Sequence, residues 1–372
     1  MIGQPARAVQ WGAVFPTLAR IIHAQPGRLV IVGSLASPAG RNCVMVHGVR
    51  MQLTGFHHLT AVTADAPGNH AFYTGTLGLR LVKKTVNQDD VSAYHLFYAD
   101  GLASPGTDIT FFDWPVGPER RGTRSIARTG LRVASVAALA WWARRFSDLG
   151  VKYLPPVDRA GRLTLEFDDP EGQRLSLVVD ESKPRANPWE KSSVPAEHQI
   201  VGLGPITLSV PDWRATDFVL TQVMNMRRGC GFAQRETDGS GSGSEFRVYH
   251  MGAEGPQAEL HLLHEPGVAA ARSGAGGVHH VAFRTPDNDA YDAWGKRLAA
   301  LGVPSSGPVD RFYFRSLYFR EPNGILFEIA TDGPGFAADE PMAKLGESLA
   351  LPPFLEPRRA AIERGLKPLT TV

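Results

Sequence analysis

A pattern repeats four times along this chain, and its copies begin near residues 55, 128, 202 and 277. In each copy a strand-like segment leads into a helix-like segment, and then into short strand-like segments joined by turns. Even spacing of this kind predicts four copies of one supersecondary unit, because stacked repeats bury a shared core. We therefore expect an α+β protein built from four βαβββ modules.

The expected helices lie at residues 70–78, 138–150, 213–225 and 289–302. In the last module, strands are expected at 311–319 and 325–330, on either side of a turn at Glu321-Pro322-Asn323-Gly324. The pattern divides the chain into 1–50 (an extension outside the fold), 51–180 (modules one and two), 181–200 (a linker), 201–332 (modules three and four) and 333–372 (a C-terminal tail packing on the modules).

The extension contains five arginines and no acidic residue. It is either a targeting leader or sequence that lies upstream of a true start at Met51. The linker is proline-rich, with Pro184, Pro188 and Pro195. We expect a fold that is complete without the extension.

Charge and composition favour a small-molecule partner. The chain has 39 Lys and Arg against 37 Asp and Glu, which gives no electrostatic footprint for nucleic acid. It has no apolar run of roughly 20 residues that could span a membrane. Two cysteines, Cys43 and Cys230, are too few for a disulfide framework and indicate a reducing cytoplasm. A homo-oligomer is compatible with this composition.

Two histidine doublets, His57-His58 and His279-His280, occupy matching positions in modules one and four. Because side chains alternate along a strand, each doublet offers one inward imidazole, although alternation does not say which. Glu328 lies in an otherwise apolar strand, where a buried carboxylate needs a counter-charge such as a metal ion. The pattern predicts a metal site, and it requires modules one and four to share a sheet.

Several further motifs accompany the doublets: Phe56-His57-His58-Leu59-Thr60, Tyr94 to Asp100, Leu262 to Pro266, Val278 to Phe283 and Gly324 to Glu328. With these motifs the chain resembles the vicinal oxygen chelate superfamily, which contains glyoxalases, bleomycin-resistance proteins and extradiol dioxygenases. It is most similar to the hydroquinone-type ring-cleaving dioxygenases of that group. The resemblance implies that the four modules form two cup-shaped barrels.

The resemblance also implies a metal and a reaction. The second histidine of each doublet would ligate the metal, so that the ligands are His58, His280 and Glu328. Two imidazoles and one carboxylate are typical of non-haem Fe(II) oxygenases, with Mn(II) as the alternative metal. Such an enzyme opens the ring of a small hydroquinone or catechol-type aromatic with O2.

Catalytic roles carry over by the same resemblance to His57, Thr60, His279, Arg311 and Tyr318. Each has a structural alternative. The first histidines can face the outer side of the sheet, and Thr60 can be an ordinary strand residue. Arg311 can be a solvated hairpin residue, and Tyr318 can be a residue of the hydrophobic core. His95 belongs to a third strand and could approach the site.

The number of ligands separates the reaction classes. Glyoxalase-type members of the superfamily use four protein ligands, and the fourth position falls on Thr110, which is a poor ligand. In modules two and three, Ser176 and Pro205 stand where ligands would, so those modules are expected to be structural. Two alternatives stay open: a metal-dependent glyoxalase-like lyase or isomerase, and a metal-free small-molecule binding protein of the same fold.

Overall fold

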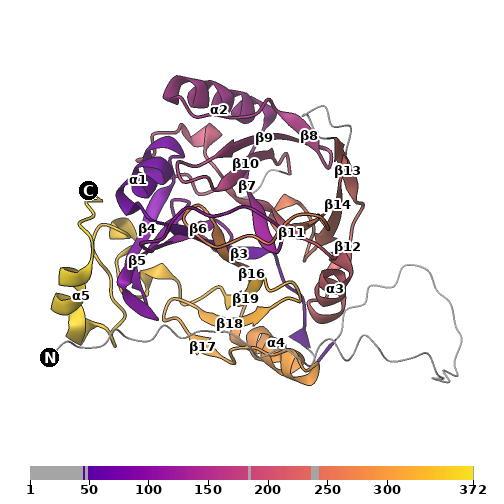
Figure 1. Ribbon diagram of the computed structural model, residues 1–372. Coiled ribbons are helices and arrows are strands. Elements are labelled where there is room, and N and C mark those ends of the chain that lie inside the picture. The colour runs from indigo at the N-terminus through magenta and orange to yellow at the C-terminus, as the bar shows by residue number, and fades with distance from the viewer. Residues whose placement is uncertain (1–44, 47–48, 183–185, 236–242, 372) are drawn as a thin grey trace, which may run out of the picture. The chain divides into compact units, whose positions relative to one another are not determined.

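The structure is a computed structural model that describes residues 45–46, 49–182, 186–235 and 243–371. It contains two large sheets and a two-stranded ladder of β1 (Met45–Val46) and β2 (Val49–Arg50) (Figure 1). The eight-stranded sheet has the order β17 (Val309–Asp310), β18 (Arg315–Arg320), β19 (Leu326–Thr331), β16 (Val278–Thr285), β3 (Phe56–Thr63), β6 (Asp108–Asp113), β5 (Asp90–Ala99) and β4 (Arg80–Asn87). The nine-stranded sheet has the order β12 (Arg227–Arg228), β14 (Gly243–His250), β15 (Glu259–His264), β11 (Gly202–Val210), β7 (Ser125–Val133), β10 (Arg174–Val179), β9 (Arg162–Asp168) and β8 (Val157–Arg159), with β13 (Phe232–Arg235) paired to β14.

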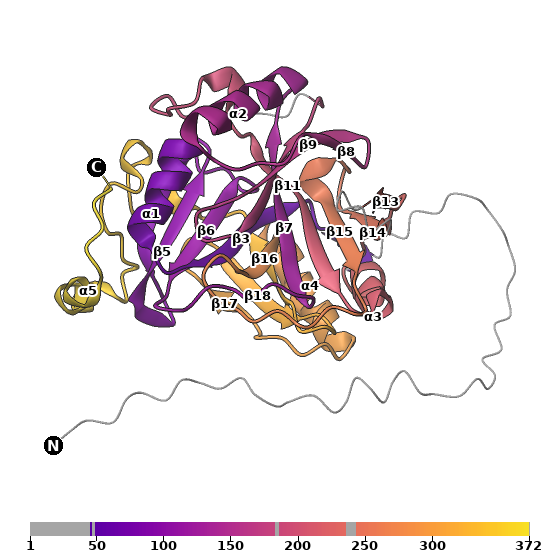
Figure 2. The same cartoon turned by 45° about the horizontal axis from the view of Figure 1, so that its top comes forward.

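The strand order confirms the predicted sharing of sheets. β3 and β16, from the first and last modules, pair antiparallel at the middle of the eight-stranded sheet, and both views show them side by side (Figures 1 and 2). The middle modules meet in the same way through β7 and β11. Within every module the first and last strands pair parallel. The α+β class with four βαβββ modules is therefore confirmed.

Two helices closely match their predicted ranges. α2 (Val136–Leu149) begins after Ser135, whose side chain accepts a hydrogen bond from the Ala138 backbone N–H (3.1 Å), and ends at Gly150 in the left-handed conformation (φ 69°). α4 (Asn288–Ala300) begins after Asp287, which caps it in the same way. Both helices bury a tryptophan completely in the hydrophobic core, Trp142 in α2 and Trp294 in α4.

The other two helices differ from prediction. α1 (Ala66–His70) begins four residues before the expected range and continues as the π-helix η2 (Ala71–Thr76). α3 (Trp213–Phe218) likewise continues as the π-helix η4 (Val219–Val223). The early start follows from Asp65, whose carboxylate accepts the Gly68 N–H (3.1 Å) and caps the helix there.

The strand predicted at 311–319 is also wrong at its beginning. Residues Arg311 to Phe314 form a tight turn, closed by a hydrogen bond from the Arg311 N–H to the Phe314 carbonyl (2.9 Å), and β18 begins only at Arg315. Phe312 in this turn adopts φ 69°, a left-handed conformation that is strained for a bulky residue. The turn carries Arg311 out of the sheet.

The C-terminal segment lies along β4 and β5. The Ala350 N–H donates to the Lys84 carbonyl (2.9 Å), and the Tyr94 hydroxyl donates to the Lys367 carbonyl (2.9 Å). The remaining short helices are η3 (Ala196–His198), η5 (Pro256–Ala258), η6 (Phe336–Ala338), η7 (Met342–Lys344), η8 (Glu356–Arg358) and α5 (Arg359–Gly365). The boundaries assigned to the linker and tail stay predictions. The extension, with Cys43, lies mostly outside the described residues.

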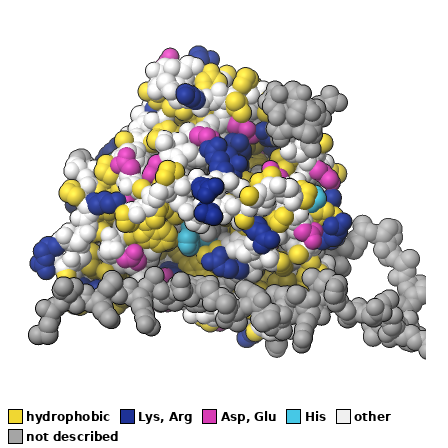
Figure 3. Space-filling view, in the orientation of Figure 1, with side chains coloured by type: hydrophobic (Ala, Val, Ile, Leu, Met, Phe, Trp, Pro, Cys, Tyr) yellow, Lys and Arg dark blue, Asp and Glu magenta, His cyan; other side chains and the backbone are white. Residues whose placement is uncertain are grey.

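None of the helices in the described ranges is long and apolar enough to cross a membrane. On the face shown in Figure 3, acidic and basic side chains of the described residues are interspersed. This mixed face agrees with the near-neutral charge balance of the sequence.

Candidate metal centre

Three neighbouring strands bring the predicted ligands together. β3 carries His58, β16 carries His280 and β19 carries Glu328, and β16 lies between the other two. The sheet register sets His58 and Glu328 on either side of Ala282. Residues opposite one another in a sheet share a face, so the two ligand candidates point into the same cup.

The three side chains converge on one point. Glu328 Oε2 lies 3.2 Å from His58 Nε2 and 3.0 Å from His280 Nε2, and the two imidazole nitrogens are 3.4 Å apart. Donor atoms about 2.0–2.2 Å from a common ion are roughly 3 Å from one another. The spacing therefore fits a metal ion held by all three residues.

Burial gives a second test of that fit. Glu328 is fully buried, and its Oε2 makes no hydrogen bond of acceptable geometry, whereas its Oε1 accepts one from the Ser316 hydroxyl. Burial favours the neutral carboxyl, but the imidazoles of His58 and His280 hold the pKa of Glu328 well below its usual range. An ionised carboxylate oxygen that faces two imidazole nitrogens fits a cation site.

The first histidines of the doublets lie behind the ligand candidates rather than on the outer side of the sheet. His57 Nδ1 is 2.9 Å from His58 Nδ1, and His279 Nδ1 is 2.8 Å from His280 Nδ1. A metal bound at Nε2 of each second histidine would leave the hydrogen on its Nδ1, from where it would be donated to the first histidine. Both pairs are therefore placed to favour the tautomer that a metal requires.

Burial keeps the first histidines neutral. It lowers the pKa of His57 to about 3, with a further contribution from His58, and it lowers the pKa of His279 to about 3, with a further contribution from His280. At neutral pH each is an uncharged imidazole. Each can therefore accept the hydrogen of its neighbour.

Arg311 and Tyr318 also meet at this cup. Tyr318 lies directly opposite Glu328 in the β18–β19 ladder, and its hydroxyl oxygen accepts from Arg311 Nε (3.3 Å). Arg311 also forms a forked pair with Asp89 on the β4–β5 turn (2.9 and 3.2 Å). Burial raises the pKa of Tyr318, which keeps the phenol protonated and able to donate.

Thr60 lies on the same face, linked to two residues from β6 and β5. The Thr110 hydroxyl donates to Thr60 Oγ1 (2.9 Å), and His95 Nε2 lies 2.9 Å from Thr110 Oγ1. Thr110 stands at the position of a fourth ligand, but these contacts occupy its hydroxyl. The described residues around the cluster therefore supply three ligands.

A small cavity of about 50 Å³ opens beside the cluster. Its wall combines ligand candidates with polar and aromatic residues: His58, Thr85, Val86, Asn87, Gln88, Asp89, His95, Phe97, Phe112, His280, Arg311, Tyr313, Phe314 and Tyr318. The size and the aromatic wall favour a compact planar ligand. All the site residues predicted from the sequence therefore either line this cavity or lie next to residues that line it.

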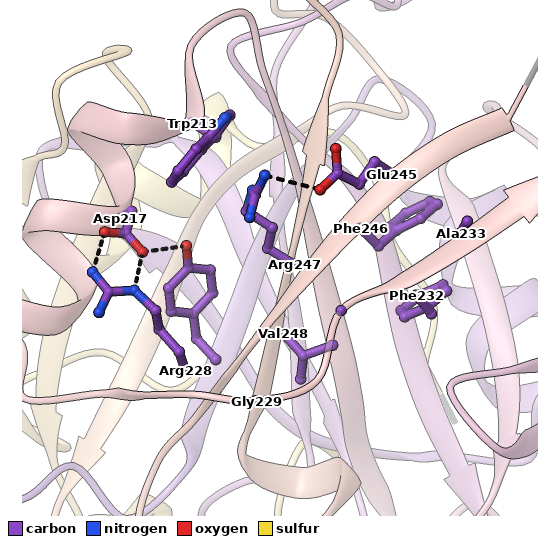
Figure 4. A pocket seen from close by; sticks show the side chains of 12 residues that line it. Trp213, Asp217, Arg228, Gly229, Phe232, Ala233, Glu245, Phe246, Arg247 and Val248 are labelled. Carbon is purple, nitrogen blue, oxygen red and sulfur yellow. Dashed lines mark hydrogen bonds and ion pairs between the residues drawn. The ribbon is translucent and has the colours of Figure 1, made fainter.

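A larger cavity, of about 620 Å³, lies elsewhere, beside α3 and β14 (Figure 4). Its ionic groups are paired with each other: Asp217 with Arg228 and Tyr249, and Arg247 with Glu245. It contains none of the histidines of the cluster. We therefore place the reactive centre at the smaller cavity.

The nine-stranded sheet contains buried ion pairs, in contrast to the histidine cluster of the eight-stranded sheet. Arg128 precedes the helix cap Ser135 by seven residues, as His58 precedes Asp65, and it pairs with Glu166 (3.1 Å). Arg162 forms a forked pair with Glu259 (2.7 Å for both bonds). These contacts agree with the expectation that modules two and three are structural.

The sequence was compared with known families and proteins. The family model described as the Glyoxalase/Bleomycin resistance protein/Dioxygenase superfamily matches residues 55–177 and 206–329. The chain belongs to this superfamily. It is 45% identical over 321 residues to MhqA of Bacillus subtilis (strain 168), named as a ring-cleaving dioxygenase, which covers 86% of this chain and 100% of that protein. It is 31% identical over 316 residues to a protein of Sphingobium indicum named chlorohydroquinone/hydroquinone 1,2-dioxygenase, which covers 82% of this chain and 93% of that one.

Solved structures agree with this membership. A crystal structure from Bacillus subtilis, named as a dioxygenase, superposes with a TM-score of 0.77 at 37% identity and covers 86% of this chain and 99% of that one. Glyoxalase I from Zea mays superposes with a TM-score of 0.54 at 16% identity, covering 75% of this chain and 92% of that one, and so shares the fold.

Sequence reasoning missed three residues of the site. Ser316 supports Glu328, Asp89 pairs with Arg311, and Thr85 lines the cavity. Each depends on a pairing between strands or turns that local patterns do not encode.

Proposed function

We propose that this protein is a ring-cleaving dioxygenase of the extradiol type that opens a dihydroxybenzene with O2. The observation that carries the proposal is the buried cluster of His58, His280 and Glu328, in which one carboxylate oxygen faces two imidazole nitrogens. Relatives that match this chain over almost their whole length are named as ring-cleaving dioxygenases. The cluster and the relatives support the same chemistry independently.

The proposed metal is Fe(II), with Mn(II) as the alternative, and its ligands are His58, His280 and Glu328. Two imidazoles and one carboxylate leave positions open for other ligands and are typical of non-haem Fe(II) oxygenases. When bound, such an ion supplies redox contact between a phenolate and O2. Its affinity depends on the neutral imidazoles and the ionised carboxylate that the strands hold together.

The other residues of the site bind and orient. Tyr318 accepts from Arg311 and keeps its own hydrogen, which can be donated to an oxygen in the cavity. His57 and His279 hold the ligand imidazoles in one tautomer, and each has a second nitrogen for proton transfer. Thr60 lies beside His280 in the β3–β16 ladder and completes the polar wall.

The glyoxalase-like alternative is less well supported. It needs a fourth ligand, and Thr110 at that position is hydrogen-bonded to Thr60 and contacted by His95. A metal-free binding protein would leave the buried Glu328 carboxylate with only the imidazoles of His58 and His280 to offset its charge, which is costly.

Product analysis tests the proposal. The Fe(II)-loaded protein is given hydroquinones and catechols with isotopically labelled O2, and products are analysed by mass spectrometry. We expect a ring-opened product that contains both labelled oxygen atoms. An unlabelled product, or an isomer of the substrate formed without O2, would instead support the lyase alternative.

A further inference from the structure

Two polar side chains stand side by side on the strands farthest from Glu328. Thr85 on β4 lies directly opposite His95 on β5, and both line the cavity that His58 and His280 also line. Directly opposed residues in an antiparallel pair share a face, with Cβ atoms about 4.5–5.5 Å apart. The two side chains therefore face the same part of the cavity.

Thr85 is buried with an unsatisfied hydroxyl. It is 3% exposed, and its Oγ1 makes no hydrogen bond of acceptable geometry. Buried hydroxyls are normally paired, because an unpaired one costs stability. Its polar neighbour is the Tyr313 hydroxyl, which itself donates to Asp339 (2.8 Å). Because Thr85 makes no well-formed hydrogen bond to that hydroxyl, it is available to a ligand.

His95 has one nitrogen fixed and the other free. Because the Thr110 hydroxyl donates to Thr60, its oxygen can only accept, so His95 Nε2 carries the hydrogen that points to Thr110. Burial lowers the pKa of His95 well below its usual range, so the ring is neutral and Nδ1 is an acceptor. No described residue is hydrogen-bonded to Nδ1.

Aromatic packing holds this imidazole in place. The ring centroids of Phe97 and Phe112 lie 3.9 and 4.4 Å from that of His95. Other polar side chains of the cavity wall are engaged with each other, since Arg311 bonds Asp89 and Tyr318, and Gln88 donates to the Arg311 carbonyl (2.9 Å). The open acceptor thus lies at His95 and the open hydroxyl beside it at Thr85.

We infer that Thr85 and His95 form a subsite for one hydroxyl group of the substrate, remote from the hydroxyl that faces the metal ligands. The substrate O–H donates to His95 Nδ1, and its oxygen accepts from Thr85. A hydroquinone, whose hydroxyls stand at opposite ends of the ring, can fill both positions, whereas a catechol has adjacent hydroxyls. This subsite rests on the proposed function and assigns to Thr85 and His95 the contact with the hydroxyl that is remote from the metal ligands.

The test measures ligand binding to the Fe(II)-loaded protein by titration calorimetry without O2. The ligands are hydroquinone and 4-methylphenol, which lacks the second hydroxyl. Thr85→Val keeps the side-chain shape and removes the hydroxyl. We expect it to weaken hydroquinone binding roughly 5- to 30-fold, as for loss of one buried hydrogen bond, and to leave 4-methylphenol unchanged. Thr129→Val is the matched control, because Thr129 also has a buried, unpartnered hydroxyl but lies on β7 of the other sheet.

His95→Phe, which keeps an aromatic ring between its neighbours, is the second variant and should weaken hydroquinone at least as much. Equal losses for hydroquinone and 4-methylphenol, or no loss with Thr85→Val, would overturn the subsite. Because binding is measured without O2, these results are separate from ring cleavage. If the protein consumes O2 with hydroquinone but Thr85→Val binds hydroquinone normally, the dioxygenase proposal stands and the subsite is wrong.

Discussion

Each ligand imidazole depends on the histidine that precedes it in sequence. The Nδ1 contacts of 2.9 and 2.8 Å place His57 and His279 where they would act on the proposed metal through His58 and His280. Second-sphere partners of this kind typically change metal affinity or activity 10- to 100-fold. Adjacent histidines in a strand thus serve two different purposes.

His279→Phe should separate metal binding from turnover. At saturating iron the variant should still be loaded, because the three ligands remain. Turnover should fall about 10²- to 10⁴-fold, since an acid–base group next to the centre is lost. Bound iron and kcat are measured together, with His264→Phe on β15 of the other sheet as the control. An unchanged kcat would show that His279 has no part in the reaction.

The sequence predicted the ligand cluster better than its surroundings. His58, His280 and Glu328 are separated by up to 270 positions, yet the repeat required modules one and four to share a sheet. Thr85 could not be found in this way. Its place opposite His95 depends on register shifts in the β4–β5 pair, which are set by tertiary packing.

At the scale of elements, capping side chains set where the helices begin. Ser135 and Asp287 fix the beginnings of α2 and α4. The π-helices that end the helical segments of modules one and three have no comparable sequence signal. The left-handed Phe312, which delays the beginning of the predicted strand to Arg315, also has none, because a bulky residue rarely adopts that conformation.

The ion pairs of the nine-stranded sheet should make its stability depend on pH. Burial favours the neutral form of Glu259, but hydrogen bonds from His261 and Arg162 lower its pKa from 4.5 to about 2. Since the folded-state pKa is depressed, the stabilisation is complete above pH 4.5 and is lost as the pH falls toward about 2.

Glu259→Gln should therefore lower the free energy of unfolding at neutral pH by about 1–3 kcal/mol, a range that allows for solvent screening of the partly exposed Arg162. The difference from the unchanged protein should shrink on acidification. Urea denaturation at a series of pH values measures it. Glu245→Gln, whose carboxylate is exposed and pairs with Arg247, should cost less than about 0.5 kcal/mol. A Glu259→Gln difference that is independent of pH would contradict this assignment.

At the scale of the whole molecule, the two sheets differ in the groups that they bury. The eight-stranded sheet gathers the ligand candidates and the smaller cavity, and in the nine-stranded sheet Arg128, the counterpart of His58, pairs with Glu166. The first and last modules meet in one sheet, so the centre forms only when both halves of the chain are folded. The oligomeric state stays a prediction.

A chain that starts at Met51 should fold and bind metal as the full chain does. Met51 is buried, and its carbonyl accepts from Asn225 Nδ2 (3.1 Å), whereas β1 and β2 before it pair with each other and not with the large sheets. Thermal denaturation and metal titration of the two chains make the comparison. Loss of folding in the shorter chain would show that residues 1–50 are integral to the structure.

The most direct test of the account measures bound iron and oxygen uptake in the same samples. Loaded anaerobically with Fe(II), the protein should retain iron and consume O2 with a hydroquinone. Glu328→Gln should lose both, since it removes the one anionic ligand, while Glu265→Gln, which lies just after β15 of the other sheet, should keep both. Retention of iron and oxygen uptake by Glu328→Gln would contradict the ligand assignment. Absence of oxygen uptake by the iron-loaded protein with every dihydroxybenzene would contradict the dioxygenase itself.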